Sequence, residues 1–334
     1  MRGVSMRDIA RRVGVSAVTV SKALSGRSGV SEETRRLIEK TAADMGYVNP
    51  RDAQAEEARA MDVGILVPER YFAPDAYYAT ICRQLVNTLS AAGHFGVLEL
   101  LTAGMEMGGT LPNLLRAGRV DAVILLGQPD AAYLRTLTAQ SVPLVFLDFY
   151  DEGASADAVV GDNAYGCYQL TSHLIGQGHR DIGFVGSCTA TSSIMDRYLG
   201  FYRAMLMHGL PIRPECVLPD RDGSARLIQP QLPQRLPTAF VCNCDLVALR
   251  TIAQLRERGV RVPEDVSVVG FDDFCALPDT TPSLTTFRLD TQAMVQIAVR
   301  MATERRTGVQ RPFGRVVVGG QPIYRSSDAP PSVP

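Results

Sequence analysis

Apolar residues in the first fifty positions follow the spacing of short amphipathic helices. Ile9, Ala10 and Val13 recur at intervals of three and four residues, which places them on one face of a helix. Gly14 interrupts this pattern, and Ser16 is a favourable N-cap for a second helix. So tight a turn predicts a helix-turn-helix, whose second helix can enter the major groove of DNA.

Two further sets of apolar positions would close a three-helix core in this segment. They are Val20, Ala23 and Leu24 in the second helix, and Leu37, Ile38, Thr41 and Ala42 in the third. The third helix begins after Ser31 and carries Glu32 and Glu33 in its first turn, where the helix dipole favours acidic residues. Helical hairpins are common, so this spacing alone also fits a plain helical bundle or a partner-binding hairpin.

From residue 62 onward, apolar runs of strand length alternate with helical patterns. The expected strands are 62–67, 95–101, 122–126 and 143–147 in a first set, and 182–185, 239–242 and 266–269 in a second. The expected helices are 78–92, 131–140, 164–177, 197–208 and 246–258. This alternation predicts parallel sheets covered by helices on both faces. The fold class is therefore α/β, with an N-terminal three-helix helix-turn-helix head and a core of two doubly wound parallel-sheet subdomains.

Side chains on the outer face of the second helix are small, hydroxylated or basic, and none is acidic. They are Ser16, Ala17, Val18, Thr19, Ser21 and Lys22. Over residues 1–50, nine Lys and Arg stand against five Asp and Glu, whereas the whole chain has a formal net charge of −1. A basic head of this kind favours contact with phosphates and base edges, which places DNA binding above the plain helical bundle.

Polar and aromatic residues follow the carboxyl ends of the expected strands, the edge at which open α/β sheets bind ligands. The candidates from these ends are Tyr71, Phe72, Gln128, Asp148, Phe149, Asp245 and Asp272. Carboxylates and amides bond hydroxyl groups and aromatic faces pack on sugar rings, so the set indicates a sugar-like ligand in a cleft. Tyr77 and Tyr78 are expected in the core of the first subdomain instead, and Asp273 could equally cap the segment after it.

Composition excludes several classes of protein. No apolar run approaches the roughly 20 residues of a membrane span, and no signal-peptide core follows Arg2, so we expect a cytoplasmic protein. Seven scattered cysteines and four histidines without ligand spacing argue against disulfides and against a metal site. Because the sequence has no phosphate-cradling loop, nucleophile elbow or nucleophile–base pair, we expect neither a cofactor nor an enzymatic activity.

Short motifs in the head carry a family resemblance. They are Asp8-Ile9-Ala10, Val15-Ser16, Thr19-Val20-Ser21, Val30-Ser31, Thr34-Arg35 and Gly46-Tyr47. With these motifs the head resembles that of the lac repressor (LacI/GalR) family of transcriptional regulators. The resemblance implies base contacts by Ala17, Val18 and Lys22, and it implies phosphate contacts by the set Ser16, Thr19, Ser21 and Arg35. Lys22 stands where many members have Arg, so a bidentate grip on guanine is lost although Lys can still donate.

The same resemblance continues beyond the head, through the segments 173–186, 197–201, 262–273 and 282–286. It implies a periplasmic-binding-protein-like core. The effector contacts that it implies are Ser193, Arg197, Cys244, Asp245 and Asp272. The Arg197 guanidinium could grip two oxygens of a polyol or a carboxylate, whereas Cys244 departs from the amide that is common at its position.

We expect the chain to be organised as a head, a hinge and a core. Their boundaries are 1–48 for the head, 49–61 for the hinge and 62–334 for the effector-binding and dimerisation core, which divides into an N-terminal subdomain of about 62–161 and 291–319 and a C-terminal subdomain of about 162–290 and 320–327. In the family, a hinge leucine wedges into the minor groove. Glu56 holds that position, and a carboxylate cannot act as an apolar wedge, so either Ala55 makes a weaker contact in the minor groove or the kink is absent.

Together these features predict a sequence-specific repressor that binds a near-palindromic operator as a homodimer and responds to a sugar or sugar derivative. The C-terminal residues carry no heptads, which favours a dimer over a coiled-coil tetramer. A sugar-binding protein without DNA regulation is the alternative, and it would leave the basic head without a role. An enzyme on the same fold is the third possibility, which turnover of a candidate sugar would support.

Overall fold

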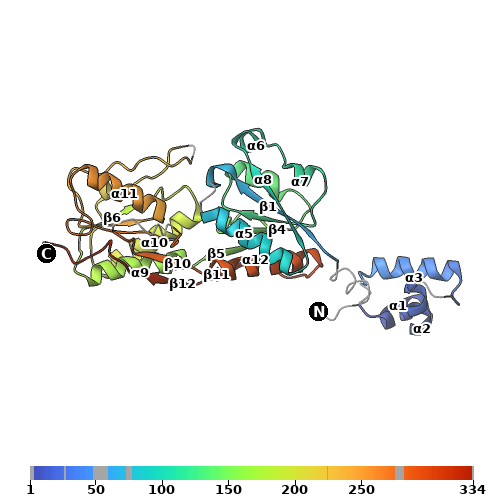
Figure 1. The fold of residues 1–334 in the computed structure, drawn as a ribbon. Coiled ribbons are helices and arrows are strands. Elements are labelled where there is room, and N and C mark those ends of the chain that lie inside the picture. The colour runs from blue at the N-terminus through green and yellow to red at the C-terminus, as the bar shows by residue number, and fades with distance from the viewer. Residues whose placement is uncertain are drawn as a thin grey trace. The chain divides into compact units, whose positions relative to one another are not determined.

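The chain divides after Ala60 into a head, Met1–Ala60, and a core, Met61–Pro334 (Figure 1). The computed structural model describes residues 4–25, 28–47, 59–72, 77–223, 225–274 and 282–332. Across these ranges we find no helix with the length and apolar character needed to span a bilayer.

Three helices form the head: α1 (Met6–Val13), α2 (Ala17–Leu24) and α3 (Glu32–Asp44). Gly14 ends α1 with a φ of +78°, which lets its own amide and that of Val15 both donate to the carbonyl of Ala10. The Ser16 hydroxyl then accepts from the amide of Thr19 and caps α2. The expected helix-turn-helix is therefore present. Gly14 and Ser16, the residues from which it was predicted, both make the hydrogen bonds expected of a helix end and an N-cap.

Six side chains make the buried centre of the head: Ile9, Ala10, Val20, Ala23, Ile38 and Ala42. The expectation that Leu37 belongs to this centre is wrong, since 52 % of Leu37 is exposed. Ile38 and Ala42 lie four residues apart and define the buried face of α3. A neighbour in sequence is rotated by about 100° around the helix, which turns Leu37 outward.

The N-terminal part of the core is built on a six-stranded parallel sheet with the order β11-β5-β4-β3-β1-β2. Its strands are β1 (Asp62–Pro68), β2 (Phe95–Leu101), β3 (Ala122–Leu126), β4 (Leu144–Leu147), β5 (Asp157–Gly161) and β11 (Arg315–Val318). Its helices are α5 (Tyr77–Ala91), α6 (Ala103–Gly108), α7 (Asn113–Arg116), α8 (Ala131–Thr138) and α12 (Thr291–Arg306), with a 3₁₀ turn at Glu69–Tyr71.

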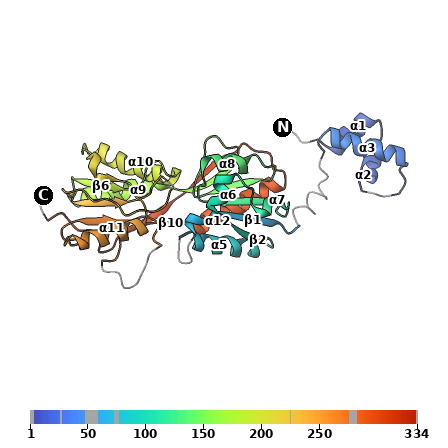
Figure 2. The same ribbon diagram turned by 90° about the horizontal axis from the view of Figure 1, so that it is seen from above.

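Helices cover both faces of this sheet. Figure 2 shows α6 and α8 on one face and α5 and α12 on the other. Alternation along β1 fits this arrangement, because Ile65 packs in the cluster with α5 and α12 while Leu66 packs in the cluster with α8. Both faces are therefore buried, as the continuous apolar runs predicted.

A four-stranded parallel sheet with the order β7-β6-β8-β9 forms the C-terminal part of the core. Its strands are β6 (Ile182–Val185), β7 (Val217–Leu218), β8 (Ala239–Cys242) and β9 (Ser267–Val269). Its helices are α9 (Asn163–Gly176), α10 (Ser192–Met207) and α11 (Asp245–Glu257), with a 3₁₀ turn at Pro214–Cys216. Helices α9 and α10 lie on one face and α11 on the other (Figures 1 and 2).

The chain passes between the two parts of the core three times: from β5 into α9, from β10 (Thr286–Leu289) into α12, and from β11 into β12 (Gly320–Ile323). Strands β10 and β12 pair antiparallel as a separate ribbon. The predicted fold class is confirmed, and every expected strand is present to within a residue or two. The sequence analysis had not placed strands at β5, β7, β10, β11 and β12.

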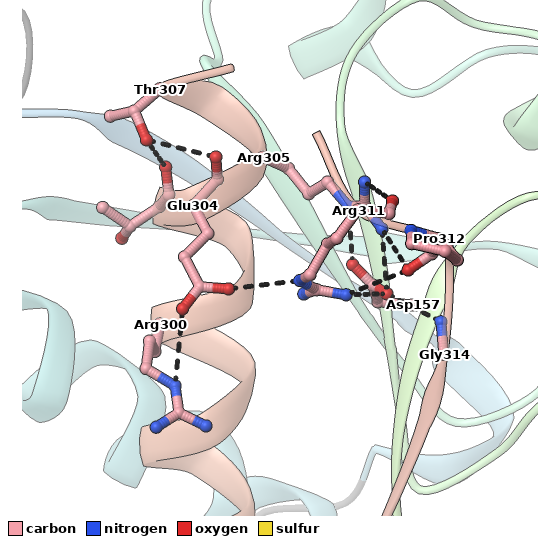
Figure 3. Close-up of polar contacts among 9 residues, drawn as sticks. Asp157, Arg300, Glu304, Arg305, Thr307, Arg311, Pro312 and Gly314 are labelled. Atoms are coloured by element: carbon pink, nitrogen blue, oxygen red, sulfur yellow. Dashed lines mark hydrogen bonds and ion pairs between the residues drawn. The ribbon is translucent and has the colours of Figure 1, made fainter. Parts of the chain in front are cut away.

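A buried carboxylate fixes the end of α12 against the sheet (Figure 3). Asp157 opens β5, is fully buried, and accepts hydrogen bonds from Arg305 at 2.7 Å and Arg311 at 2.7 Å. The amide of Gly314, one residue before β11, donates to the same carboxylate. One side chain at the start of β5 is thus joined to the end of α12 and to the segment that leads into β11, which lie far from it in sequence.

Candidate functional site

A cavity of about 550 Å³ lies between the two parts of the core, at the carboxyl ends of both parallel sheets. Its walls are assembled from the segments that leave β1, β4, β7, β8 and β9, together with the first turn of α5 and the first two turns of α10 and α11. This volume lies within the range of small-molecule sites, and the lining is mostly apolar with a few convergent polar groups.

Arg197 of α10 is the central polar group of the cavity. It is 96 % buried, and its Nε donates to the side-chain oxygen of Asn163 at 2.8 Å. One terminal nitrogen donates to the carbonyl of Asn243, and the other pairs with Asp272 at 2.9 Å. The guanidinium also stacks 4.0 Å from the ring centre of Phe271. Arg197 is therefore held rigidly, with the rest of its donors available to a ligand.

Close helix packing places this arginine. Helix α10 lies directly against α9, and Gly200 sits at their contact. A side-chain carbon at Gly200 would collide with the carbonyl oxygen of Ala164, so only glycine allows the approach. The approach brings Arg197, one turn earlier on α10, to Asn163 at the start of α9.

Two carboxylates face Arg197 from opposite walls of the cavity. Burial raises the pKa of Asp272 to about 8, although its ion pair with Arg197 opposes this effect. Burial likewise raises the pKa of Asp148, against the same arginine and a 2.8 Å hydrogen bond from the hydroxyl of Tyr78. Both residues have left-handed backbones, with φ of +66° at Asp148 and +106° at Asp272. Such non-glycine conformations are uncommon and cluster at functional sites.

Aromatic rings form one wall of the cavity. Tyr71 and Tyr77 both contact Tyr78 with ring centres 5.6 Å apart, and Phe274 meets Tyr77 at 6.3 Å. The hydroxyl of Tyr77 and one carboxylate oxygen of Asp148 are buried and have no hydrogen-bond partner among the described residues. Rings with adjacent unpartnered oxygens can pack on a sugar ring and bond its hydroxyls.

Six of the ten predicted effector residues line this cavity: Tyr71, Asp148, Ser193, Arg197, Cys244 and Asp272. Burial raises the pKa of the Cys244 thiol to about 12, so this group stays protonated at neutral pH and can contribute only a weak hydrogen bond. The other four predicted residues, Phe72, Gln128, Phe149 and Asp245, lie outside the lining and have structural contacts instead.

Those four residues correct the sequence analysis. Phe149 is buried and stacks on Phe146 with ring centres 4.5 Å apart, and Phe72 packs against the main apolar cluster. The side chain of Gln128 accepts from the amide of Ser192 at 2.8 Å and so joins the two parts of the core. The carboxylate of Asp245 is occupied by the hydroxyl of Thr286 and the amide of Phe274, which positions the segment after β9.

The cavity also contains residues that the sequence analysis missed. Tyr77 and Tyr78 line it, contrary to the expectation that they belong to the core, because the first turn of α5 faces the cleft. Three arginines were not expected either: Arg70, Arg221 and Arg250. Arg250 lies inside α11, two turns from the strand end, and no local pattern distinguishes it from a surface arginine. Asp273 accepts hydrogen bonds from Arg288 and Arg325, and the segment that it could cap lies largely outside the described residues.

In the head, the predicted DNA-contact residues form the outer face of α2. Val18 is 65 % exposed, and Lys22 and Ser21 are exposed as well. The hydroxyls of Ser16 and Thr19 lie 2.9 Å apart and bond each other at the start of α2. Ala17 is partly exposed at the first position of the same helix.

Arg35 is partly buried and donates to the carbonyl of Ala23 at 2.8 Å, which ties α3 to the end of α2. Its predicted phosphate contact would thus be made by a side chain that already has a structural role. The hinge residues Ala55 and Glu56 lie outside the described residues.

Comparisons with known proteins cover both units. Residues 5–49 match the model of "Bacterial regulatory proteins, lacI family", and residues 171–327 match that of a "Periplasmic binding protein-like domain". The transcriptional regulator MalR of Streptomyces coelicolor is 30% identical over 338 residues, which cover 97% of this chain and 96% of MalR. The transcriptional repressor PurR of Glaesserella parasuis is 28% identical, with 90% of this chain and 89% of PurR covered.

A solved structure is similar along the same length. It is the complex of the transcriptional regulator CelR with cellobiose, with a TM-score of 0.67, 27% sequence identity, and coverage of 97% of this chain and 99% of CelR. The three related proteins are transcriptional regulators rather than enzymes.

Proposed function

This chain belongs to the LacI family of bacterial regulatory proteins, a family of DNA-binding transcriptional regulators, and we propose that it is a repressor whose operator affinity is set by an effector in the core cavity. The observation that carries the proposal is Arg197: a buried, fully oriented guanidinium in a cavity between two subdomains of a chain that also has a helix-turn-helix head. We keep the boundaries 1–48, 49–61 and 62–334 as those of head, hinge and core.

The outer face of α2 supports major-groove binding by the head. Ala17 and Val18 are small enough to approach base edges, and they offer apolar contact to a thymine methyl group. Lys22 follows one turn later as the single cationic side chain of the helix, and no acidic residue precedes it on α2. We therefore assign base contacts to these three residues and phosphate contacts to Ser16, Thr19, Ser21 and Arg35.

Lys22→Ala should weaken operator binding by about 1–3 kcal/mol and relax the preference at one base position, because Lys22 is proposed to donate to a base edge. The measurement is selection of the full-length protein against random duplex DNA, followed by titration of the enriched operator. Lys40→Ala, which removes an exposed lysine of α3, is the control for loss of head charge alone.

The control variant should weaken binding uniformly across sequences while the preferred site stays the same. An unchanged operator preference in Lys22→Ala would remove Lys22 from the base-reading set. Enrichment of a near-palindromic site by the wild-type protein would support a dimer with two heads on adjacent half-sites. Absence of any enriched sequence, from folded protein, would contradict the proposed function.

The cavity supports a sugar-like effector. Its aromatic wall suits a sugar ring, and the unpartnered oxygens of Tyr77 and Asp148 suit hydroxyl donors. The related CelR was solved with cellobiose. We assign effector contacts to Tyr71, Asp148, Ser193, Arg197, Cys244 and Asp272, and we add Tyr77 and Tyr78.

Effector binding would act through the bonds that cross the cleft. On one side of the cavity, Gln128 accepts from the amide of Ser192, and the hydroxyl of Tyr150 donates to Asp196 at 3.0 Å. A ligand that bridges the walls shifts the balance between closed and open arrangements of the two subdomains. Coupling to DNA is reciprocal, so operator DNA must change effector affinity by the same factor that the effector changes operator affinity.

An apolar edge of the core supports the homodimer. Strand β2 ends the six-stranded sheet, and 63 % of Phe95 and 40 % of Leu98 are exposed. Val97 on β2 and Val86 on the neighbouring α5 are each 39 % exposed as well. An exposed apolar edge strand is unfavourable in a monomer, and a second copy of the chain would cover it.

Leu98→Glu should therefore shift the protein from dimer to monomer, because the new carboxylate would be buried without a partner in the dimer. Light scattering after size-exclusion chromatography measures the mass directly. Leu206→Glu is the control, since it places the same charge on an exposed leucine of α10. A dimer that persists in Leu98→Glu and dissociates in Leu206→Glu would place the interface on α10 instead.

We propose further that the protein acts in the cytoplasm, needs no cofactor and catalyses no reaction on its effector. Incubation of the purified protein with each sugar that it binds, followed by analysis of the recovered sugar, tests the last point. Recovery of unchanged sugar at the end of a long incubation is the expected result, and turnover would revive the enzyme alternative.

A further inference from the structure

The arginines of the cavity differ in whether a carboxylate lies within ion-pair distance. Three of its four arginines each meet a carboxylate, as Arg70 with Glu106, Arg197 with Asp272 and Arg221 with Asp220. Arg250 is partly buried in α11, lines the cavity, and has neither an ion pair nor a hydrogen bond within the described part of the chain. Among the described residues, one cationic group of the cavity thus has no counter-charge.

The surroundings of Arg250 make this charge effective. Leu246 lies one turn earlier on the same face of α11, and Leu227 and Phe274 contribute further apolar surface to the cavity. Apolar surface near a charge lowers the local dielectric constant and strengthens its attraction for an anion.

Carboxylates on the other walls compensate this charge only weakly. Asp272 is bound to Arg197, and Asp148 accepts from Tyr78. Burial raises the pKa values of both groups, that of Asp272 to about 8. Near neutral pH Asp272 therefore carries less negative charge than an exposed carboxylate would, and burial shifts Asp148 in the same direction.

A second guanidinium, that of Arg221, lines the same cavity. Arg221 follows β7, and its Nε is buried without a hydrogen-bond partner among the described residues. Its ion pair with Asp220 is long, at 3.5 Å, and its guanidinium lies 5.9 Å from the ring centre of Tyr71. Some N–H groups of Arg221 are therefore available to donate to a ligand.

We propose that the effector carries an anionic group, a phosphate or a carboxylate, that binds Arg250 with Arg221 beside it. The inference rests on the proposed function, because it assumes that the effector occupies this cavity. The guanidinium of Arg250 offers charge-assisted, bidentate bonds that match either anion. The hydroxyl-bearing part of the ligand then lies toward Asp148 and the tyrosines, so the effector class is a sugar phosphate or a sugar acid.

Matched pairs of ligands test this inference. The melting temperature of the full-length protein is measured at constant ionic strength with inorganic phosphate against chloride, with glucose 6-phosphate against glucose, and with galacturonate against galactose. Inorganic phosphate, and the anionic member of at least one pair, should stabilise the wild-type protein more than its neutral or chloride reference.

Arg250→Gln should remove that difference and lower the affinity for the anionic probes about 10- to 100-fold, the range expected for lost bonds to a charged group. Arg256→Gln is the matched control, because Arg256 is an exposed arginine of the same helix and does not line the cavity. The control protein should respond like the wild type.

Two results would overturn the anionic subsite: no stabilisation of the wild type by phosphate or by any anionic sugar beyond its reference, or an undiminished anion response in Arg250→Gln. Binding of neutral sugars in either case would leave the proposed function intact. Failure of every sugar, neutral or anionic, to change operator affinity would count against the proposed function instead. A stabilisation by inorganic phosphate that the wild type shows and Arg250→Gln lacks would by itself support the anionic subsite.

Discussion

An Arg197→Ala protein is expected to lose its effector response and about 3–5 kcal/mol of core stability together. The substitution removes the partner of buried Asp272, and it leaves the oxygens of Asn163 and Asn243 without their donor. Each buried acceptor that loses a charged donor costs about 1–3 kcal/mol, and Asp272, without the arginine that opposes the rise of its pKa, must take up a proton instead of keeping its charge. Thermal or urea unfolding measures the loss, and operator binding with and without ligand measures the response.

Two further variants separate the structural role of Arg197 from its role in binding. Arg197→Lys keeps the positive charge but loses the planar fork, so it should fold and respond to ligand only weakly. Arg203→Ala, which removes an exposed arginine two turns along α10, should cost no more than about 1 kcal/mol and leave the response unchanged. An effector response that survives in Arg197→Lys and in Arg197→Ala would exclude Arg197 from the binding site.

The head was predictable in detail because its signals are local. The caps at Ser16 and Ser31 and the left-handed turn at Gly14 each involve residues no more than five positions apart. The error at Leu37 arose because two large apolar residues, Leu37 and Ile38, stand next to each other in α3. Only the packing of α3 against α1 and α2 decides which of the two turns inward.

Strands of the core were predictable where apolar runs are bounded by turns, as at β1 and β3. Strand β5 was missed because its first residue is a charged one, Asp157, whose burial depends on arginines about 150 positions away. Strands β11 and β12 follow each other closely yet pair with different partners, and nothing local distinguishes the two pairings.

The cavity was predictable as a location and only partly as a set of residues. Residues after a strand end alternate in direction, and a left-handed backbone changes the alternation again. Asp148 has φ of +66° and faces the cavity, whereas the next residue, Phe149, turns into the apolar core. Arg250 belongs to the cavity because α11 packs on β8, which is tertiary information that a single helix pattern does not contain.

Asp157→Asn is the second substitution for which we expect a large effect, a loss of about 3–5 kcal/mol in the free energy of unfolding. The aspartate has no exposed surface and is the shared acceptor for Arg305, Arg311 and the amide of Gly314 (Figure 3). An amide in its place removes the negative charge and turns its NH2 group toward at least one guanidinium; Arg305 then has no counter-charge among the described residues, while Arg311 keeps only its 3.4 Å pair with Glu304. Urea unfolding at neutral pH measures the difference, and Glu152→Gln, a charge removal at an exposed neighbour, should stay within about 0.5 kcal/mol.

The pH dependence of this difference distinguishes lost charge from lost shape. Burial alone would raise the pKa of Asp157, but hydrogen bonds from Arg305 and Arg311 outweigh it and hold the pKa below the usual 3.8. A carboxyl whose pKa is lowered by folding stabilises the protein above its unfolded pKa and loses that contribution as the pH falls through the folded value. The stability gap between wild type and Asp157→Asn should therefore be constant from pH 7 to about pH 5 and narrow as the pH falls below 4. A gap that stays the same down to the lowest pH at which the wild type folds would mean that the ion pairs add nothing, and that the side chain acts by its shape alone.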